Sequence, residues 1–200
     1  MQRLIAAEPD ITNYDTVAGD GDCGIGLKRG AEAISKMLKD FKSTSDPLIF
    51  LQRVTKVVEN TMDGTSGALY AIFLNALAAG VRGQSPSASS AAADVSEQMQ
   101  VGIWARGLEA AMQALGRYTP AQVGDRTLVD ALDPFVSTLS RTGSVEKAAQ
   151  AADQGAKKTQ DMKASLGRTV YIGGDNVKEV PDPGAYGLAI FLKGLNEGLK

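Results

Sequence analysis

The stretch IGLKRGAEAISKML, residues 25–38, decides the fold class of this chain. Its apolar residues recur near one face of a 3.6-residue repeat, as in an amphipathic α-helix: Ile25, Leu27, Ala31, Ile34, Met37 and Leu38. Residues 168–172 form the only β-branched and aromatic stretch, and they are too few to start a sheet. The chain is therefore predicted to be all-α.

Similar helical patterns occupy most of the remaining chain. They cover residues 2–7, 48–58, 68–81, 95–115, 128–139, 145–162 and 185–199. Together with the first stretch they predict about eight antiparallel amphipathic helices in a bundle or barrel. Asp46-Pro47 and Asp182-Pro183 each place a capping side chain before a proline, which is typical of a helix start.

The composition excludes several classes of function. The 200 residues fit one domain, and the net charge of −2 argues against sequence-independent nucleic-acid binding. The absence of histidine removes Ser-His-Asp triads and histidine zinc sites, and the single cysteine, Cys23, forms no internal disulfide. No signal peptide is recognised, and no apolar run approaches the roughly 20 residues of a membrane span. We expect one cytoplasmic domain over residues 1–200, with no nucleic-acid or membrane partner.

Glycine and aspartate are concentrated in the loops between the predicted helices. The richest segments are residues 15–26, 62–67, 124–127 and 167–184. These loops precede alternate helices, and alternate loops of an up-down bundle lie at the same end. We therefore expect one site, built from these loops, at one end of the bundle.

Three aspartates in the first of these loops are candidate metal ligands. Asp15, Asp20 and Asp22 are close enough in sequence for their carboxylates to repel one another unless a cation lies between them. Hard divalent cations such as Mg²⁺ prefer such oxygen ligands. The EF-hand pattern does not fit, and the same aspartates are also consistent with solvated turn and capping residues.

Two helix starts are candidate phosphate sites. Gly64-Thr65-Ser66-Gly67 offers free amides and hydroxyls at the start of a helix, and Asp182-Pro183-Gly184 opens the last helix in the same way. Simple helix capping accounts for either segment equally well. Arg168 lies in an otherwise uncharged stretch, either as a phosphate ligand or as an ordinary surface arginine. Carboxylates beside such helix ends point to a site for a magnesium nucleotide.

The order of the motifs resembles one known family. GDGDCG (19–24), GTSGALY (64–70), GDRTLVDAL (124–132), GRTVYIG (167–173) and PDPGA (181–185) resemble the C-terminal nucleotide-binding domain, or L domain, of ATP-dependent dihydroxyacetone kinases. The resemblance covers essentially the whole chain. It implies a barrel of eight helices with ATP and two Mg²⁺ at one end, the metal ligands being Asp15, Asp20 and Asp22. The implied nucleotide contacts are Cys23, Gly24, Ile25, Gly26, Thr65, Ser66, Leu128, Arg168, Asp182, Pro183 and Gly184.

The resemblance also implies a kinase reaction that this chain cannot complete alone. The family's ketone substrate is bound through a histidine of a separate substrate-binding K domain, and this chain has no histidine. We therefore expect the chain to donate the γ-phosphoryl group of ATP to dihydroxyacetone, or glyceraldehyde, held by a K domain in the same full-length chain or in another subunit. No catalytic base is assigned in this chain, and a homodimer of the full-length protein is left open.

Two departures from the family pattern affect the site. Asp63 stands where the family usually has a glycine, so a carboxylate lies next to the proposed phosphate cradle. Residues 116–124 are longer than usual, which leaves open which of them contacts the nucleotide.

Three other functions remain open. The first is the phosphotransferase-system form, whose L domain carries a bound ADP. The second is cyclisation of FAD at the same magnesium–phosphate site, and the third is a non-catalytic, metal-binding helical module.

Overall fold

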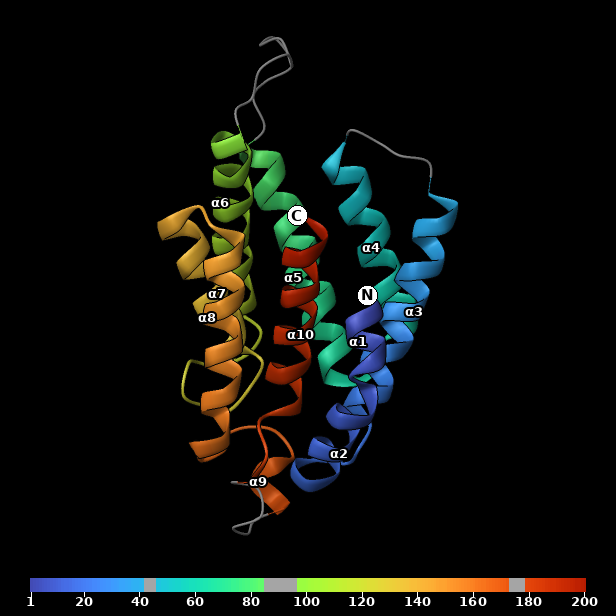
Figure 1. The fold of residues 1–200 in the computed structure, drawn as a ribbon, viewed down its shortest axis with the longest axis vertical. Helices are drawn as coiled ribbons and strands as arrows, with labels where there is room; N and C mark the ends of the chain where they lie inside the picture. The colour runs from blue at the N-terminus through green and yellow to red at the C-terminus, as the bar shows by residue number, and fades with distance from the viewer. Residues whose placement is uncertain (42–45, 85–96, 173–178) are drawn as a thin grey trace.

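The computed structural model describes residues 1–41, 46–84, 97–172 and 179–200. In these ranges the chain forms ten α-helices and one 3-10 turn, with no strand, so the all-α prediction is confirmed. The long helices run alternately up and down a bundle (Figure 1). Their bounds are α1 Gln2–Ala6, α2 Glu8–Ala18, α3 Cys23–Asp40, α4 Pro47–Thr61, α5 Gly64–Gln84, α6 Glu97–Leu115, α7 Val129–Thr142, α8 Val145–Lys158, η1 Thr159–Asp161, α9 Thr169–Ile172 and α10 Pro183–Gly198.

Helix α2 is the main difference from the prediction. We expected a short helix over residues 2–7 and a loop over residues 15–26, but a second helix follows α1 and ends only at Ala18. Pro9 occupies its first turn, where a missing N–H costs nothing, and Thr12 Oγ1 donates to Glu8 Oε1 at 2.9 Å. Asp15 therefore belongs to a helix. The loop prediction was wrong for residues 15–18 and also for residues 23–26, which open α3.

The other boundaries agree closely with the sequence patterns. Asp46 and Asp182 act as helix caps, since their carboxylates accept from the backbone N–H of Leu48 at 2.8 Å and of Ala185 at 2.7 Å. Part of the β-branched stretch forms the short helix α9. The predicted helix start at residue 95 and residues 173–178 of the last loop lie outside the described residues.

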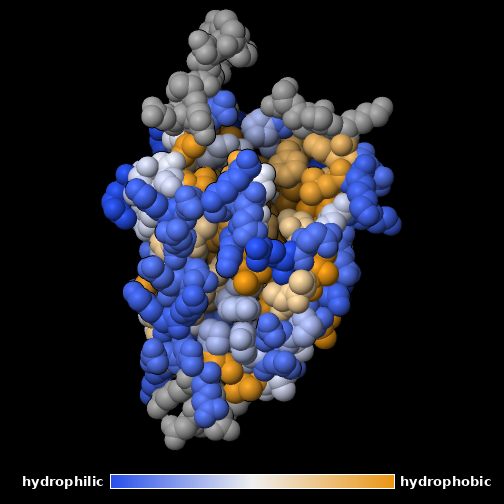
Figure 2. All heavy atoms as spheres, viewed as in Figure 1, coloured by the Kyte–Doolittle hydropathy of each residue, from blue (hydrophilic) through white to orange (hydrophobic). Residues whose placement is uncertain are grey.

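Two apolar clusters meet at α10. The larger cluster contains residues of all helices from α4 through α8 and of α10, and the smaller one contains residues of α1, α2 and α3. Close packing depends on small residues: a Cβ on Gly187 of α10 would lie 2.4 Å from Leu27 Cδ1 of α3. Figure 2 shows mainly hydrophilic side chains on one face, with apolar ones in a hollow near α4 and α5. Helix α10 thus connects the two halves of the bundle.

Helix α5 corrects one expectation drawn from the sequence. Its residues Gly64–Gly83, with a mean hydropathy of 1.4, are long and apolar enough to cross a membrane by length and composition. The core helix of a soluble protein meets the same criterion, and a third of this segment is buried here, where α5 packs between α4 and α6. The prediction that no apolar run approaches the length of a span was therefore wrong.

Candidate functional site

The predicted loops lie at one end of the bundle. Helices α3, α5 and α10 begin there, α2 ends there, and α9 lies beside them (Figure 1). Leu128, just before α7, approaches the same place, because a Cβ on Gly184 would lie 3.7 Å from Leu128 Cβ. The structure thus brings together helix ends that are separated by more than a hundred residues in sequence.

The three candidate metal ligands converge at this end. One carboxylate oxygen from each of Asp15, Asp20 and Asp22 lies within 4.8 Å of the others. Asp15 is only 6% exposed on α2, whereas Asp20 and Asp22 are exposed in the turn that follows. Gly21 in this turn has a φ of 79°, which glycine adopts without strain. A mixed set of one buried and two exposed carboxylates could hold a hard divalent cation open to solvent on one side.

The protein itself compensates the negative charges of this cluster only in part. Burial raises the pKa of Asp15, the Cys23 N–H lowers it, and the charges of Asp20 and Asp22 raise it further. The backbone N–H of Cys23 donates to Asp15 Oδ2 at 2.9 Å. Backbone hydrogen bonds to Asp15 and the guanidinium of Arg168, 3.1 Å from Asp20, offset the three negative charges only in part. A bound divalent cation would offset the remaining negative charge, so the donor set fits Mg²⁺.

The turn is packed tightly onto α2. A Cβ on Gly19 would lie 2.2 Å from Asp15 Oδ1, and a Cβ on Gly24 would lie 2.3 Å from Thr12 Oγ1. At Gly24 the backbone of α2 is also too close, because the Glu8 carbonyl oxygen would lie 2.6 Å from such a Cβ, so only glycine fits there. At Gly19 a Cβ would require the Asp15 side chain or the turn to move. The glycines of the GDGDCG motif therefore allow the turn to pack against α2.

Arg168 lies against this cluster. Its Nη2 atom is 3.1 Å from Asp20 Oδ2, and the next residue, Thr169, donates its hydroxyl to the carbonyl of Ala18 at 2.6 Å. The start of α9 is thereby attached to the end of α2. The structure places Arg168 beside the predicted metal ligands, where a phosphate held by a metal would also lie.

The predicted phosphate cradle opens α5. Gly64 has a φ of 70°, Thr65 is exposed and Ser66 is half-buried. A Cβ on Gly67 would lie 2.1 Å from the carbonyl oxygen of Met62, so the turn before α5 folds onto its first turn. Exposed amides and hydroxyls at such a helix start can bind an anion.

The carboxylate of Asp63 forms an ion pair with Arg29. Its Oδ2 atom lies 2.6 Å from Arg29 Nη2, and Arg29 Nε donates to the Thr61 carbonyl at 2.5 Å. The Asp63 side chain is 85% exposed, so this pair contributes little to stability. Arg29 nevertheless supplies a compensating positive charge for the carboxylate that departs from the family pattern.

Residues at the start of α3 interact electrostatically with Asp182 at the start of α10. Burial raises the pKa of Asp182 to about 7, although the Ala185 N–H and Arg126 lower it. Burial also raises the pKa of the Cys23 thiol, as do the charges of Asp15 and Asp182. Cys23 is therefore a neutral thiol, unsuited to act as a nucleophile. The remaining predicted residues of this turn differ in exposure: Gly24 is buried, and Ile25 is 54% exposed.

Two buried polar residues near the site were not predicted. Arg126 is 2% exposed and Thr159 is fully buried, and both bond to the segment that leads into α10. The only sequence signal was the position of Arg126 inside the GDRT motif. Its partners lie 33 and 54 residues away, beyond the reach of a local pattern.

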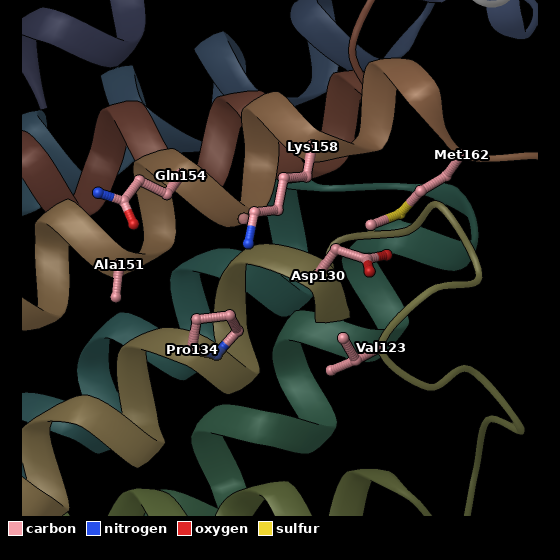
Figure 3. A pocket seen from close by; sticks show the side chains of 8 residues that line it. Val123, Asp130, Pro134, Ala151, Gln154, Lys158 and Met162 are labelled. Carbon is pink, nitrogen blue, oxygen red and sulfur yellow. The ribbon is translucent and has the colours of Figure 1, made fainter.

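A cavity between α7 and α8 does not coincide with this site. It has a volume of about 170 Å³, and Figure 3 shows Lys158 and Met162 beside Asp130 and Pro134 at its wall. None of the predicted metal or nucleotide residues lines it. We therefore assign the candidate site to the loop end of the bundle.

Comparisons with known proteins find relatives that share most of this chain. Dihydroxyacetone kinase of Pichia angusta is 42% identical over 98% of this chain and 32% of its own length. Human triokinase/FMN cyclase is 31% identical over 98% of this chain and 33% of its own. The solved dihydroxyacetone kinase from C. freundii in complex with AMP-PNP and Mg²⁺ has a TM-score of 0.75 at 23% identity, over 98% of this chain and 32% of that one.

The chain spans about a third of the length of these relatives. Residues 17–197 match the family described as the DAK2 domain. The chain shares its helical fold with the C. freundii kinase. This chain therefore belongs to the DAK2 domain family.

Proposed function

We propose that this chain is the ATP- and Mg²⁺-binding domain of a dihydroxyacetone kinase. The observation that carries the proposal is the convergence of Asp15, Asp20 and Asp22 within 4.8 Å, beside the first turns of α3, α5 and α10. Carboxylates that hold a hard cation next to free helix amides form a site suited to a metal-bound triphosphate. The names of the relatives give the reaction class and the acceptor, dihydroxyacetone.

Each group of residues has a distinct role in this proposal. The three aspartates hold two Mg²⁺, which when bound neutralise charge on the phosphates during transfer. The start of α5, with Thr65 and Ser66, donates hydrogen bonds to phosphate oxygens. Arg168 adds a positive charge at the same place, and the remaining nucleotide contacts come from Cys23–Gly26, Leu128 and Asp182–Gly184. Preorganised donors of this kind stabilise the developing charge.

The acceptor is held elsewhere in this proposal. The chain has no histidine, and its relatives are about three times as long as the part it matches. We propose that a K domain, on the same full-length chain or on a separate subunit, holds the triose near the γ-phosphate. The single domain over residues 1–200 and its cytoplasmic location belong to the same proposal, and a homodimer is left open.

Calorimetric titration with ATP and Mg²⁺ tests the binding role. The unaltered chain should bind MgATP, Asp20→Asn should abolish binding, and Asp40→Asn, at the opposite end of α3, should leave it unchanged. Circular dichroism should show equal helicity in all three proteins. Binding by Asp20→Asn with unchanged affinity would remove this carboxylate from the metal site.

A coupled assay of glycerone phosphate formation tests whether the acceptor is held by a separate K domain. The 200-residue chain alone should give no efficient turnover, because positioning of the substrate supplies roughly 7–11 kcal/mol of a barrier. Adding a K domain in trans should restore turnover. Efficient turnover by the chain alone would place the substrate site within it.

A second activity is favoured by the name that several relatives share. The human homologue is named triokinase/FMN cyclase, and cyclisation of FAD would use the same magnesium–phosphate site. Incubation with FAD and analysis for a cyclic flavin phosphate distinguishes this activity from triose phosphorylation. ADP that remains bound after purification would instead favour the phosphoryl-carrier form.

A further inference from the structure

Arg126 is buried beside the segment that leads into α10. It lies in the GDRT turn before α7, is 2% exposed, and has a φ of 59°, which is uncommon for a residue with a side chain. The carboxylate of Asp130 folds this turn, accepting from Gly124 N at 2.6 Å and from Thr127 N at 2.8 Å. The turn is therefore held in the shape that directs Arg126 inward.

The guanidinium connects two other segments of the chain. Its Nε atom donates to the Thr159 carbonyl at 3.0 Å, and Nη2 donates to the Val180 carbonyl at 2.6 Å. Thr159 follows α8, and Val180 lies in the segment just before α10. The planar fork of an arginine can hold two backbone carbonyls in one fixed geometry.

Thr159 continues this connection to Asp182. The Thr159 hydroxyl donates to the Ala156 carbonyl at 2.5 Å and accepts from the backbone N–H of Asp182 at 2.7 Å. The Asp182 carboxylate in turn accepts from Ala185 N at 2.7 Å, which caps α10. An unbroken set of hydrogen bonds thus leads from Arg126 to the first turn of α10.

These bonds lie where regular structure contributes little. Residues 162–168 and 180–182 lie outside any helix, so helix hydrogen bonds do not fix the entry to α10. Burying a charged side chain is unfavourable unless its hydrogen bonds are satisfied, and an apolar residue could fill the same space more favourably. Arg126 is better explained by the geometry that it imposes on its two partners.

We propose that Arg126 and Thr159 are positioning residues that hold Asp182-Pro183-Gly184 in place to contact the nucleotide. This inference rests on the proposed function of the chain. Neither side chain needs to touch the nucleotide, because each acts through the backbone of the segment. A segment held in place before binding loses less conformational entropy when the nucleotide binds.

Thr159→Val and Thr55→Val form a matched pair for the test. Thr55 of α4 is also a buried threonine whose hydroxyl donates to a carbonyl of its own helix, that of Leu51 at 2.8 Å. Both variants lose such a bond, but only Thr159→Val loses the bond from Asp182. In titrations with ATP and Mg²⁺, Thr159→Val should weaken affinity about tenfold and Thr55→Val less than about twofold.

Two further variants separate positioning from stability. Thr159→Ser keeps the hydroxyl and should keep the affinity for MgATP, even though the lost methyl group lowers the melting temperature. Arg126→Lys keeps the charge but cannot bond both carbonyls in the same way, so its affinity should fall. Without nucleotide, the Asp182 amide should exchange hydrogen faster in Thr159→Val than in Thr55→Val.

The outcomes distinguish this inference from the proposed function. If the unaltered chain does not bind MgATP, the proposed function fails and this inference fails with it. If the unaltered chain binds MgATP and the two valine variants have equal affinities, this inference alone is overturned. Loss of affinity in Thr159→Val, with recovery in Thr159→Ser, supports it.

Discussion

The guanidinium of Arg168 lies 3.1 Å from the carboxylate of Asp20, so a predicted phosphate ligand contacts a predicted metal ligand. The two residues are far apart in sequence and meet because Thr169 bonds to the Ala18 carbonyl at the end of α2. In the absence of a metal, Arg168 partly neutralises the acidic cluster. Binding of a cation to Asp20 would leave the guanidinium available to a phosphate.

Arg168→Gln should therefore have opposite effects on two ligands. Mg²⁺ alone should bind slightly more tightly, by no more than about fivefold, because an exposed ion pair of this kind contributes about 0.2–1 kcal/mol. MgATP should bind about tenfold or more weakly, because a charge-assisted hydrogen bond is lost. Separate calorimetric titrations measure both, with Arg117→Gln as an exposed control. Equal affinities for MgATP in the two variants would exclude Arg168 from the phosphate site.

Gly19→Ala should disrupt the acidic cluster without altering any carboxylate. The new Cβ would lie 2.2 Å from Asp15 Oδ1, so the Asp15 side chain or the turn must move. We expect MgATP affinity to fall by more than about tenfold, since ligand geometry decides how tightly Mg²⁺ binds. Gly83→Ala is the control, because a Cβ there meets nothing within 4 Å. Normal affinity in Gly19→Ala would show that Asp15 is not required in its observed position.

The double substitution Thr65→Ala, Ser66→Ala tests the start of α5. Each hydroxyl bonded to a charged phosphate contributes on the order of 1 kcal/mol or more, so MgATP should bind about tenfold or more weakly. Ser137→Ala, an exposed hydroxyl on α7, is the control in the same titration. If the double variant stays within about twofold of the unaltered chain, the two hydroxyls serve only the helix.

The pH dependence of stability should reveal Asp182. Its pKa rises from an ordinary 3.8 to about 7 on folding because burial disfavours the charged form. The folded chain then keeps a proton that the unfolded chain loses, so stability falls as pH rises from about 4 to about 7. Asp182→Asn should flatten this decline while keeping a cap for Ala185 N. Asp15, whose pKa is also raised, retains part of the slope.

Urea unfolding of the nucleotide-free chain across this pH window measures the effect. Asp153→Asn is an informative control, since Asp153 forms an exposed ion pair with Lys157 on α8 at 2.6 Å. If Asp182→Asn and the unaltered chain decline in parallel, Asp182 ionises normally in the folded state.

Most of the helices could be predicted because their signals are local. The apolar period of residues 25–38 and the Asp-Pro starts at Asp46 and Asp182 depend on neighbours within one or two turns. Helix α2 was missed because its amphipathic pattern is weak and its last turn leads directly into the GDGDCG motif. A glycine-rich motif can continue a helix end as readily as it can form a loop.

The sequence alone determined the helical architecture, the end of the bundle where the motifs gather, and the residue types available there. Only the tertiary structure decided that Asp15 lies buried on a helix, that Asp63 pairs with Arg29, and that Arg168 meets Asp20. It also decided that Arg126 reaches backbone carbonyls 33 and 54 residues away. Helix periodicity is set by hydrogen bonds between near neighbours, whereas these contacts depend on how distant segments pack, which no local pattern specifies.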